Sequence, residues 1–232
     1  MDIKILHEDS HIIVVVKPPK IPSQGDKTGD KDMLTYVEEY LLSQHPNTKK
    51  PYVGLIQRLD RPVGGVMVFA KTKLANQKLS EQIRLKKIGK EYYGVVCGVP
   101  NKDQDILVDY LVKLTQLNMS KVVSNGTANA KEAILDYEVK ETIETPEHGP
   151  LTLLKIILKT GRHHQIRVQL SNANLPLWGD SKYNPAFVKQ KEWTQIALWA
   201  GVLTLEHPIT NKRYTFQSLP NDQYPFNMFH II

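Results

Sequence analysis

The sequence predicts an α+β fold in which helices flank a mostly antiparallel sheet. Short apolar runs follow one another with few polar residues between them, which is the pattern of strands joined as hairpins. About four segments have helical spacing, and they do not alternate with the strands as a parallel βαβ fold requires. The chain has 232 residues, enough to bury a full hydrophobic core. We therefore expect a single domain over residues 1–232.

The N-terminal region is expected to form one strand and one helix. Residues 11–17 are mostly β-branched and predict a buried strand. Prolines within residues 18–22 exclude helix and central strand, so this stretch is an extended loop. Residues 23–32 are polar and rich in Gly, Asp and Lys, which indicates a flexible loop. Asp32 can cap a helix that is stopped by His45-Pro46-Asn47.

The segment around Asp60 predicts two strands joined by a tight turn. Asp60 lies in this turn between Arg58 and Arg61. Pro62 restricts the backbone, and the Gly64-Gly65 pair permits a positive φ or the close approach of another backbone. A carboxylate on a turn between rigid strands is well placed for chemistry. The alternative is a solvated ion-pair cluster that contributes under about 1 kcal/mol.

A basic segment, residues 71–90, carries the whole excess of positive charge. It holds seven Lys and Arg residues and one acidic residue, so its net charge equals the +6 of the entire chain. Apolar spacing predicts a helix over about Lys73–Lys87 that ends at Gly89, with its basic residues on the exposed side. A concentrated basic patch is typical of a protein that binds nucleic acid. The alternative is an ordinary solvated helix face.

The remaining sequence is expected to be rich in short strands. They are predicted at 91–97, 106–108, 111–117, 121–123, 133–139, 152–159, 197–205 and 213–217. Asn125-Gly126 predicts a hairpin turn. A helix is expected over about His163–Asn172, where the adjacent His163 and His164 would diverge by about 100° and make a poor pair of metal ligands.

Several classes of protein are disfavoured. The single cysteine, Cys97, excludes an internal disulfide framework and a multi-cysteine zinc site. His7 and His11 have helical ligand spacing but flank a turn, which does not suit zinc. The N-terminus lacks a signal-peptide pattern and no run of 18 apolar residues exists, so we expect a cytoplasmic protein without membrane contact.

Four motifs occur in one order along the chain. The first is Gln57-Arg58-Leu59-Asp60-Arg61 followed by Gly64-Gly65, and the second is Lys90-Glu91-Tyr92. The third is Gly161-Arg162-His163-His164-Gln165-Ile166-Arg167-Val168. The fourth is Leu177-Trp178-Gly179-Asp180-Ser181-Lys182-Tyr183. With these motifs, the sequence from about Ile5 to Phe216 resembles the RluA-type family of RNA pseudouridine synthases.

This resemblance implies a fold, a reaction and a partner. The family fold is a curved antiparallel sheet with a central RNA-binding cleft. The first strand begins near His11, so we expect the catalytic domain without the small S4-like RNA-binding domain that the family often carries. The implied reaction converts uridine to pseudouridine in ribosomal or transfer RNA, with no cofactor and no metal. We expect structured RNA as the partner and a monomeric enzyme.

The resemblance also implies roles for individual residues. Asp60 is the expected catalytic carboxylate, acting either by removing a sugar proton to give a glycal or by covalent attack. Arg167 is expected to supply the cation that pairs with it. Tyr92 is expected to stack on the flipped base, the alternative being a core residue of a strand. The residues expected to contact RNA are Arg58, Arg61, Arg162, His164, Gln165, Lys86 and Lys87.

Three departures from the family pattern bear on which RNA is bound. Gln57 stands where the family has His, Val63-Gly64 where it has Thr-Ser, and Trp199 where it has His. Two other functions stay open. One is a non-catalytic RNA-binding or ribosome-assembly protein on the same fold. The other is a hydrolase such as a glycosidase, which needs two carboxylates flanking the bond, and no second acid stands out in the motifs.

Overall fold

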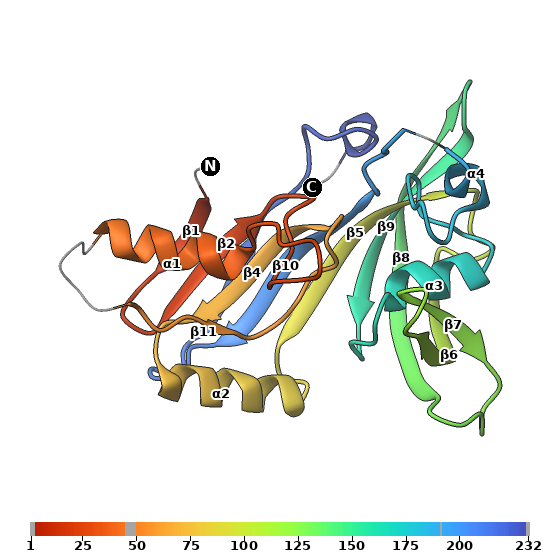
Figure 1. Ribbon diagram of the computed structural model, residues 1–232. Coiled ribbons are helices and arrows are strands. Elements are labelled where there is room, and N and C mark those ends of the chain that lie inside the picture. The colour runs from red at the N-terminus through yellow and green to blue at the C-terminus, as the bar shows by residue number, and fades with distance from the viewer. Residues whose placement is uncertain (1–2, 45–49, 191, 231–232) are drawn as a thin grey trace. The chain divides into compact units, whose positions relative to one another are not determined.

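The structure, a computed structural model, describes residues 3–44, 50–190 and 192–230. The chain forms two compact units (Figure 1). The first comprises Met1–Lys90 and Ala200–Leu219, and the second comprises Glu91–Trp199 and Pro220–Ile232. Eight strand pairs among the described residues, β1–β2, β2–β4, β3–β4, β5–β9, β6–β7, β6–β8, β8–β9 and β10–β11, are antiparallel, which confirms the predicted α+β class with a mostly antiparallel sheet. The expectation of one catalytic domain over residues 1–232 stays a prediction.

The first unit is a sheet with two helices. Its strand order is β1-β2-β4-β10, with β11 beside β10 and β3 beside β4. Its elements are β1 (Lys4–Glu8), β2 (Ile12–Lys17), α1 (Met33–Gln44), β3 (Gly54–Leu55), β4 (Gly64–Ala70), α2 (Lys73–Arg84), most of β10 (Leu198–Glu206) and β11 (Arg213–Gln217). The predicted strand at 11–17 and the predicted closing pair are confirmed, whereas β1 was not predicted because it lacks a β-branched run.

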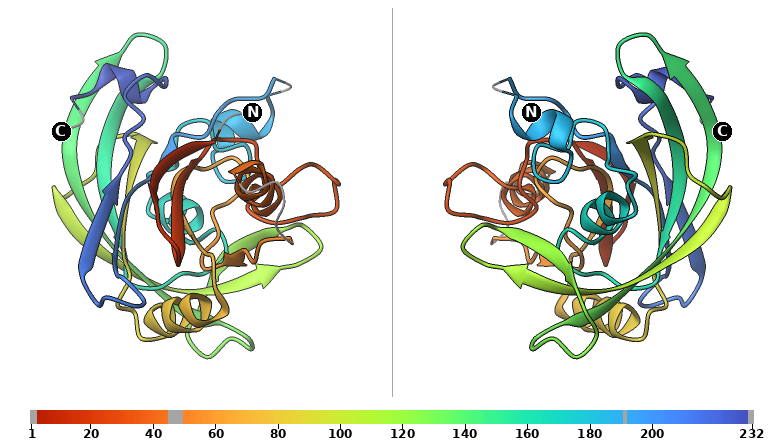
Figure 2. Two further views of the ribbon diagram at one scale, coloured as in Figure 1. Left: turned by 90° about the vertical axis from the view of Figure 1, so that its left-hand side faces the viewer. Right: turned by 90° about the vertical axis from the view of Figure 1, so that its right-hand side faces the viewer.

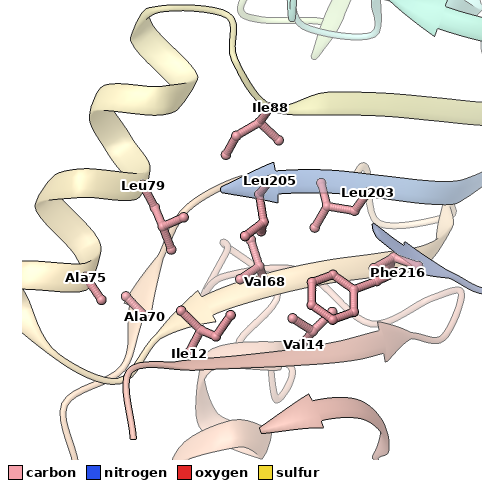
Figure 3. Packing of buried hydrophobic residues seen from close by; sticks show 11 residues of the cluster. Ile12, Val14, Val68, Ala70, Ala75, Leu79, Ile88, Leu203, Leu205 and Phe216 are labelled. Atoms are coloured by element: carbon pink, nitrogen blue, oxygen red, sulfur yellow. The ribbon is translucent and has the colours of Figure 1, made fainter. Parts of the chain in front are cut away.

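The core of the first unit lies between α2 and one face of this sheet (Figure 3). Ile12 and Val14 of β2 and Val68 of β4 form one cluster with Ala75 and Leu79 of α2, and all five are fully buried. The two helix residues are four positions apart and therefore share one face of α2. Each buried aliphatic side chain contributes about 1.5–3 kcal/mol, so this cluster fixes α2 on the sheet.

The start of α1 confirms the predicted cap. The Asp32 carboxylate accepts the backbone N–H of Thr35 at 2.8 Å. The buried residues Met33, Val37 and Leu41 then follow at helical spacing and form the inward stripe. The predicted stop at 45–47 lies outside the described residues.

The end of α2 differs from the prediction. The helix stops at Arg84 instead of Lys87 because Lys86 adopts a left-handed backbone with a φ of 56°. The N–H of Lys86 donates to the carbonyl of Ile83 at 3.1 Å, and that of Lys87 donates to the carbonyl of Gln82 at 2.9 Å. This pair of bonds closes the last turn as a glycine cap usually does.

The second unit is a sheet in the order β5-β9-β8-β6-β7, with α3 packed against β6 and β7. Its elements are most of β5 (Gly89–Cys97), β6 (Gln104–Leu114), β7 (Met119–Val123), β8 (Lys131–Thr145), β9 (Gly149–Leu158), α3 (Gln165–Asn172), α4 (Pro185–Val188) and the short helix η1 (Phe226–Met228). Figure 2 shows the long strands of this unit bending along their length, as the prediction of a curved sheet requires.

Two predictions for this region were wrong in detail. β6 is one continuous strand where two short ones were expected, because Asp109 pairs with Ala133 of β8 in the middle of it. The N–H of Thr127 donates to the carbonyl of Ser124 at 3.2 Å, so Asn125-Gly126 does form a turn. This turn closes no hairpin, because β6 lies between β7 and β8 in the sheet.

Gly65 provides a test of how β4 is packed. Its φ is +127°, and a Cβ there would lie 2.2 Å from the carbonyl oxygen of Ala200. We expect Gly65→Ala to lower the free energy of unfolding by at least about 3 kcal/mol, through backbone strain and overlap together. Urea unfolding measures this loss. Gly126→Ala is the matched control, because Gly126 also has a positive φ but no atom within 4 Å. Equal losses in the two variants would contradict the close approach.

Candidate functional site

The turn that carries Asp60 follows β3 and leads into β4. The backbone N–H of Val63 donates to the carbonyl of Asp60 at 2.9 Å and closes a four-residue turn that contains Pro62. This arrangement confirms the predicted strand, turn and strand. Asp60 itself is half-buried.

Two buried side chains hold the backbone on both sides of Asp60. The Ser23 hydroxyl donates to the carbonyl of Leu59 at 2.8 Å and accepts the N–H of the same residue at 3.0 Å. On the other side, the Lys17 ammonium donates to the carbonyl of Arg61 at 3.0 Å. Because Ser23 is 5% exposed and Lys17 0% exposed, water does not compete for these bonds.

Lys17 is a site residue that sequence reasoning did not identify. Its ammonium also donates to the carbonyls of Pro18 at 3.1 Å and Ile21 at 2.6 Å, so all three of its donors are used. Burial lowers the pKa of Lys17 to about 7, against the opposing attraction of the Asp60 charge. The sequence did contain a sign of this role: Lys17 directly follows the run of β-branched residues that predicts a buried strand, and every residue of that strand is buried.

Arg61 is engaged by the loop that precedes α1. Its guanidinium donates to the carbonyl of Lys20 at 3.0 Å and to the Thr28 hydroxyl at 2.9 Å, and it forms a short ion pair with Asp30. The hydrogen bond that Arg61 donates to the Asp30 carboxylate is the main reason why the pKa of Arg61 is raised. The loop expected to be flexible therefore has a defined set of contacts around Arg61. Arg58 is exposed.

Gln57, the first departure from the family pattern, lies on the way into this turn. Its amide nitrogen donates to the carbonyl of Val66 at 3.2 Å. Its amide oxygen is buried and has no hydrogen-bond partner among the residues that the structure describes. The amide nitrogen of Gln57 thus bonds to β4, and its amide oxygen, three residues before Asp60 in the chain, can still accept a hydrogen bond.

In the second unit, Arg167 and Asp180 form a buried ion pair. Nε of Arg167 donates to Oδ2 of Asp180 at 2.8 Å, and Nη2 donates to Oδ1 at 2.7 Å. The two side chains are 4% and 0% exposed. A bidentate pair of this kind is strong and fixes the plane of the guanidinium. Asp180 was part of the fourth motif, but sequence reasoning gave it no role.

Asp180 also organises the segment that follows it. Its Oδ1 accepts the backbone N–H of Lys182 at 2.9 Å and of Tyr183 at 3.2 Å. The Tyr183 ring lies 5.2 Å from the Arg167 guanidinium, and its hydroxyl accepts the N–H of Ser120 at 2.6 Å. Residues of the fourth motif therefore donate hydrogen bonds to Asp180, the partner of Arg167.

His164 corrects the predicted start of α3. The helix begins at Gln165, because His164 has a left-handed backbone with a φ of 54° and cannot lie on the helix. Its ring stacks on His163 with centroids 3.8 Å apart, whereas divergence was expected. Nδ1 of His164 lies 2.8 Å from the Tyr183 hydroxyl. Burial and then the charge of Arg167 lower the pKa of His164 to about 2, so this imidazole is neutral.

Gln165 and Arg162 are partly used within the fold. The Gln165 amide oxygen accepts the Thr160 hydroxyl at 2.8 Å and the N–H of Arg162 at 2.9 Å. Its amide nitrogen donates to the carbonyl of Ile134 at 3.1 Å. Nε of the exposed Arg162 donates to the carbonyl of Glu132 at 2.9 Å. Their contacts with RNA stay predictions.

The other predicted residues lie on β5 and after α2. Tyr92 and Tyr93 are successive residues of β5 and are both buried. Lys86 and Lys87 are exposed just beyond α2. Asp60 belongs to the first unit, and Tyr92 and Arg167 belong to the second.

The described residues contain neither a cluster of metal ligands nor a helix that could span a membrane. Among the described residues, no group of three or more His, Cys, Asp or Glu side chains could hold a metal ion. Burial raises the pKa of the half-buried Cys97 thiol. None of the helices described is long and apolar enough to cross a membrane.

Comparison with known proteins gives consistent matches. A model of the RNA pseudouridylate synthase family matches residues 11–172. The uncharacterized RNA pseudouridine synthase YlyB of Bacillus subtilis is 31% identical, over 96% of this chain and 71% of that protein. The ribosomal large subunit pseudouridine synthase D of Pseudomonas aeruginosa is 31% identical, over 96% of this chain and 70% of that protein.

A solved structure shares the fold. Human RNA pseudouridylate synthase domain containing 4 aligns with a TM-score of 0.77 at 22% identity, over 93% of this chain and 88% of that chain. This likeness confirms the predicted fold.

The buried Lys17 predicts a dependence of stability on pH. The folded chain releases this proton at about pH 7, whereas the unfolded chain keeps it up to the ordinary pKa of 10.5. Between these values the unfolded state binds more protons, so stability rises with pH. We expect wild type to gain stability relative to Lys17→Met between pH 7 and 10, measured by urea unfolding. Lys113→Met, at an exposed lysine, should follow wild type. Parallel curves for wild type and Lys17→Met would contradict this assignment.

The Arg167–Asp180 pair predicts a large loss of stability when it is broken. Arg167→Ala leaves the Asp180 carboxylate buried without its partner, which costs about 3–5 kcal/mol. Thermal and urea unfolding measure this loss. Arg84→Ala is the control, because Arg84 and its partner Glu81 are both exposed and should change stability little. Normal melting of Arg167→Ala would show that the pair does not hold the unit together.

Proposed function

This chain belongs to the RNA pseudouridylate synthase family, and we propose that it isomerises uridine in structured RNA with Asp60 as its catalytic carboxylate. Ribosomal RNA is the first candidate substrate and transfer RNA the second, because a relative at 31% identity is named as a ribosomal large subunit enzyme. The observation that carries the assignment of Asp60 is its turn, whose backbone is held on both sides by the buried Ser23 and Lys17.

The reaction explains why a fixed carboxylate is needed. The glycosidic bond must break, the base must turn, and C5 must bond to C1′ of the sugar. Both routes left open by the sequence, proton removal to a glycal and covalent attack, require the carboxylate next to the sugar. A side chain held in place before the substrate arrives does not have to be ordered during the reaction. The anchored turn supports this role for Asp60.

Arg167 and Tyr92 complete the proposed catalytic set. Arg167 is the proposed cation, and its bidentate pairing with Asp180 orients its guanidinium. Tyr92 is the proposed platform for the flipped base, a contact worth about 1–3 kcal/mol. Neither the carboxylate route nor the platform calls for a cofactor or a metal, and we propose none. We also propose that the enzyme is a cytoplasmic monomer.

The proposed RNA contacts fall into two groups. Arg58, Arg162, Lys86 and Lys87 are exposed and can reach phosphates directly. The other predicted contacts, Arg61, His164 and Gln165, already bond within the protein, so we expect them to shape the site. Binding through the exposed group should weaken as salt rises.

The direct test is release of tritium from RNA labelled at uridine C5. The RNA is total RNA from cells that lack this gene, and C5 loses its hydrogen only when it forms the new bond. We expect release by wild type and none by Asp60→Asn, because the amide cannot act as the carboxylate. Asp103→Asn, at an exposed carboxylate, is the control and should release tritium as wild type does.

Two results would contradict the proposal. Tritium release by a well-folded Asp60→Asn would remove Asp60 from the chemistry. No release by wild type, together with salt-sensitive binding of RNA, would favour a non-catalytic RNA-binding or ribosome-assembly protein.

A further inference from the structure

A pocket of about 200 Å³ lies in the second unit, beside the segment organised by Asp180. One wall comes from the fourth motif, one from α4, and the rest from the segment that leads toward β10. The lining residues are Ser181, Phe187, Gln190, Glu192, Trp193 and Thr194. Ser181 belongs to the fourth motif, whereas the sequence gave no role to the other five, and all six lie beyond residues 11–172, which match the family model.

The pocket is fixed to the Arg167–Asp180 pair. Ser181 directly follows Asp180 in the chain. At Gly179, which has a φ of +73°, a Cβ would lie 2.4 Å from the carbonyl oxygen of Gln195. The backbone after the pocket therefore packs directly on the backbone before it. This contact sets the position of the outer wall relative to Asp180.

Trp193 gives the pocket an unusual aromatic wall. It is 53% exposed, whereas the chain's two other tryptophans, Trp178 and Trp199, are buried. A half-exposed aromatic ring beside a hollow offers a surface on which a planar ligand can stack. Phe187, on the α4 side, is buried and rests on Trp178 with ring centroids 5.2 Å apart.

The polar side chains of the pocket fit the edge of a base better than a phosphate. The Thr194 hydroxyl donates to the Gln190 amide oxygen at 3.2 Å, which leaves the amide nitrogen as a donor. The exposed carboxylate of Glu192 can accept from an amino group and repels a phosphate. Stacking combined with such edge contacts is how single-stranded RNA is read.

We propose that this pocket binds an unpaired nucleobase of the substrate RNA that carries an exocyclic amino group, stacked on Trp193 with its amino group donating to Glu192. The inference rests on the proposed function for the identity of the substrate. In this proposal the segment between α4 and β10 helps to select the RNA substrate and takes no part in the chemical step.

The test uses the position of Trp193 as the exposed member of three tryptophans. The full-length protein is titrated with short oligo(A), oligo(C) and oligo(U), and binding is followed separately by anisotropy of an end-labelled oligonucleotide. We expect oligo(A) and oligo(C) to quench the tryptophan emission and to protect it from acrylamide more than oligo(U) does. In Trp193→Phe the emission of the two buried tryptophans should not respond.

Variants separate stacking from edge recognition. Loss of one stacking platform weakens binding by about 5- to 150-fold, so we expect a loss in that range for Trp193→Ala and a smaller one for Trp193→Phe. Glu192→Gln should remove the preference for oligo(A) and oligo(C). Tyr52→Ala, at an exposed aromatic residue of the first unit, is the control and should bind as wild type does.

The outcomes distinguish this inference from the proposed function. Oligonucleotide binding by anisotropy without any change in Trp193 emission would overturn the base site and leave a protein partner as the occupant. If wild type also releases tritium, the enzyme assignment stands while this inference falls. A response of Trp193 in a protein that releases no tritium would keep the base site and remove the reaction.

Discussion

In the first unit, one buried lysine side chain connects several segments of the chain. Lys17 ends a strand whose residues are all buried, and its three hydrogen bonds hold three separate carbonyls, one of them in the Asp60 turn. A buried amino group without hydrogen-bond partners is costly, so the three carbonyls stabilise Lys17, and in turn Lys17 ties the end of β2 to the proline loop and to the Asp60 turn. The requirement that stabilises β2 thus also positions the proposed catalytic carboxylate.

The second unit also contains a buried basic side chain, but here its partner is a carboxylate and not a set of backbone carbonyls. There a guanidinium on α3 meets a carboxylate from the fourth motif, and both are removed from water. A buried ion pair is stable only when its hydrogen bonds are well aligned and its other polar atoms also have partners. Here the Asp180 carboxylate accepts two further hydrogen bonds, from the backbone N–H groups of Lys182 and Tyr183. In each of the two units, therefore, one buried basic side chain holds a segment that was singled out by a motif.

The sequence predicted those features that depend on local pattern. The β2 strand, the Asp32 cap, the Asp60 turn and the β10–β11 pair follow from side-chain periodicity and turn residues. The start of α3 and the end of α2 were wrong because His164 and Lys86 adopt left-handed backbones, which non-glycine residues do rarely. The contacts of Lys17 and the pairing of Arg167 with Asp180 were not predicted, because such contacts join residues distant in sequence or depend on how the chain folds back. The predicted pairing of Arg167 with Asp60 stays a prediction.

The contact at Gly179 has a consequence for how enzymes of this kind diverge. It joins Gly179, the residue before Asp180, to Gln195, close to the start of β10, so the chain between them, which includes α4 and the pocket, begins and ends at one place. Residues between α4 and Gln195 can therefore change in number or type while this contact and the Arg167–Asp180 pair stay as they are. Changing which RNA is bound would then require substitutions in one short stretch of the chain.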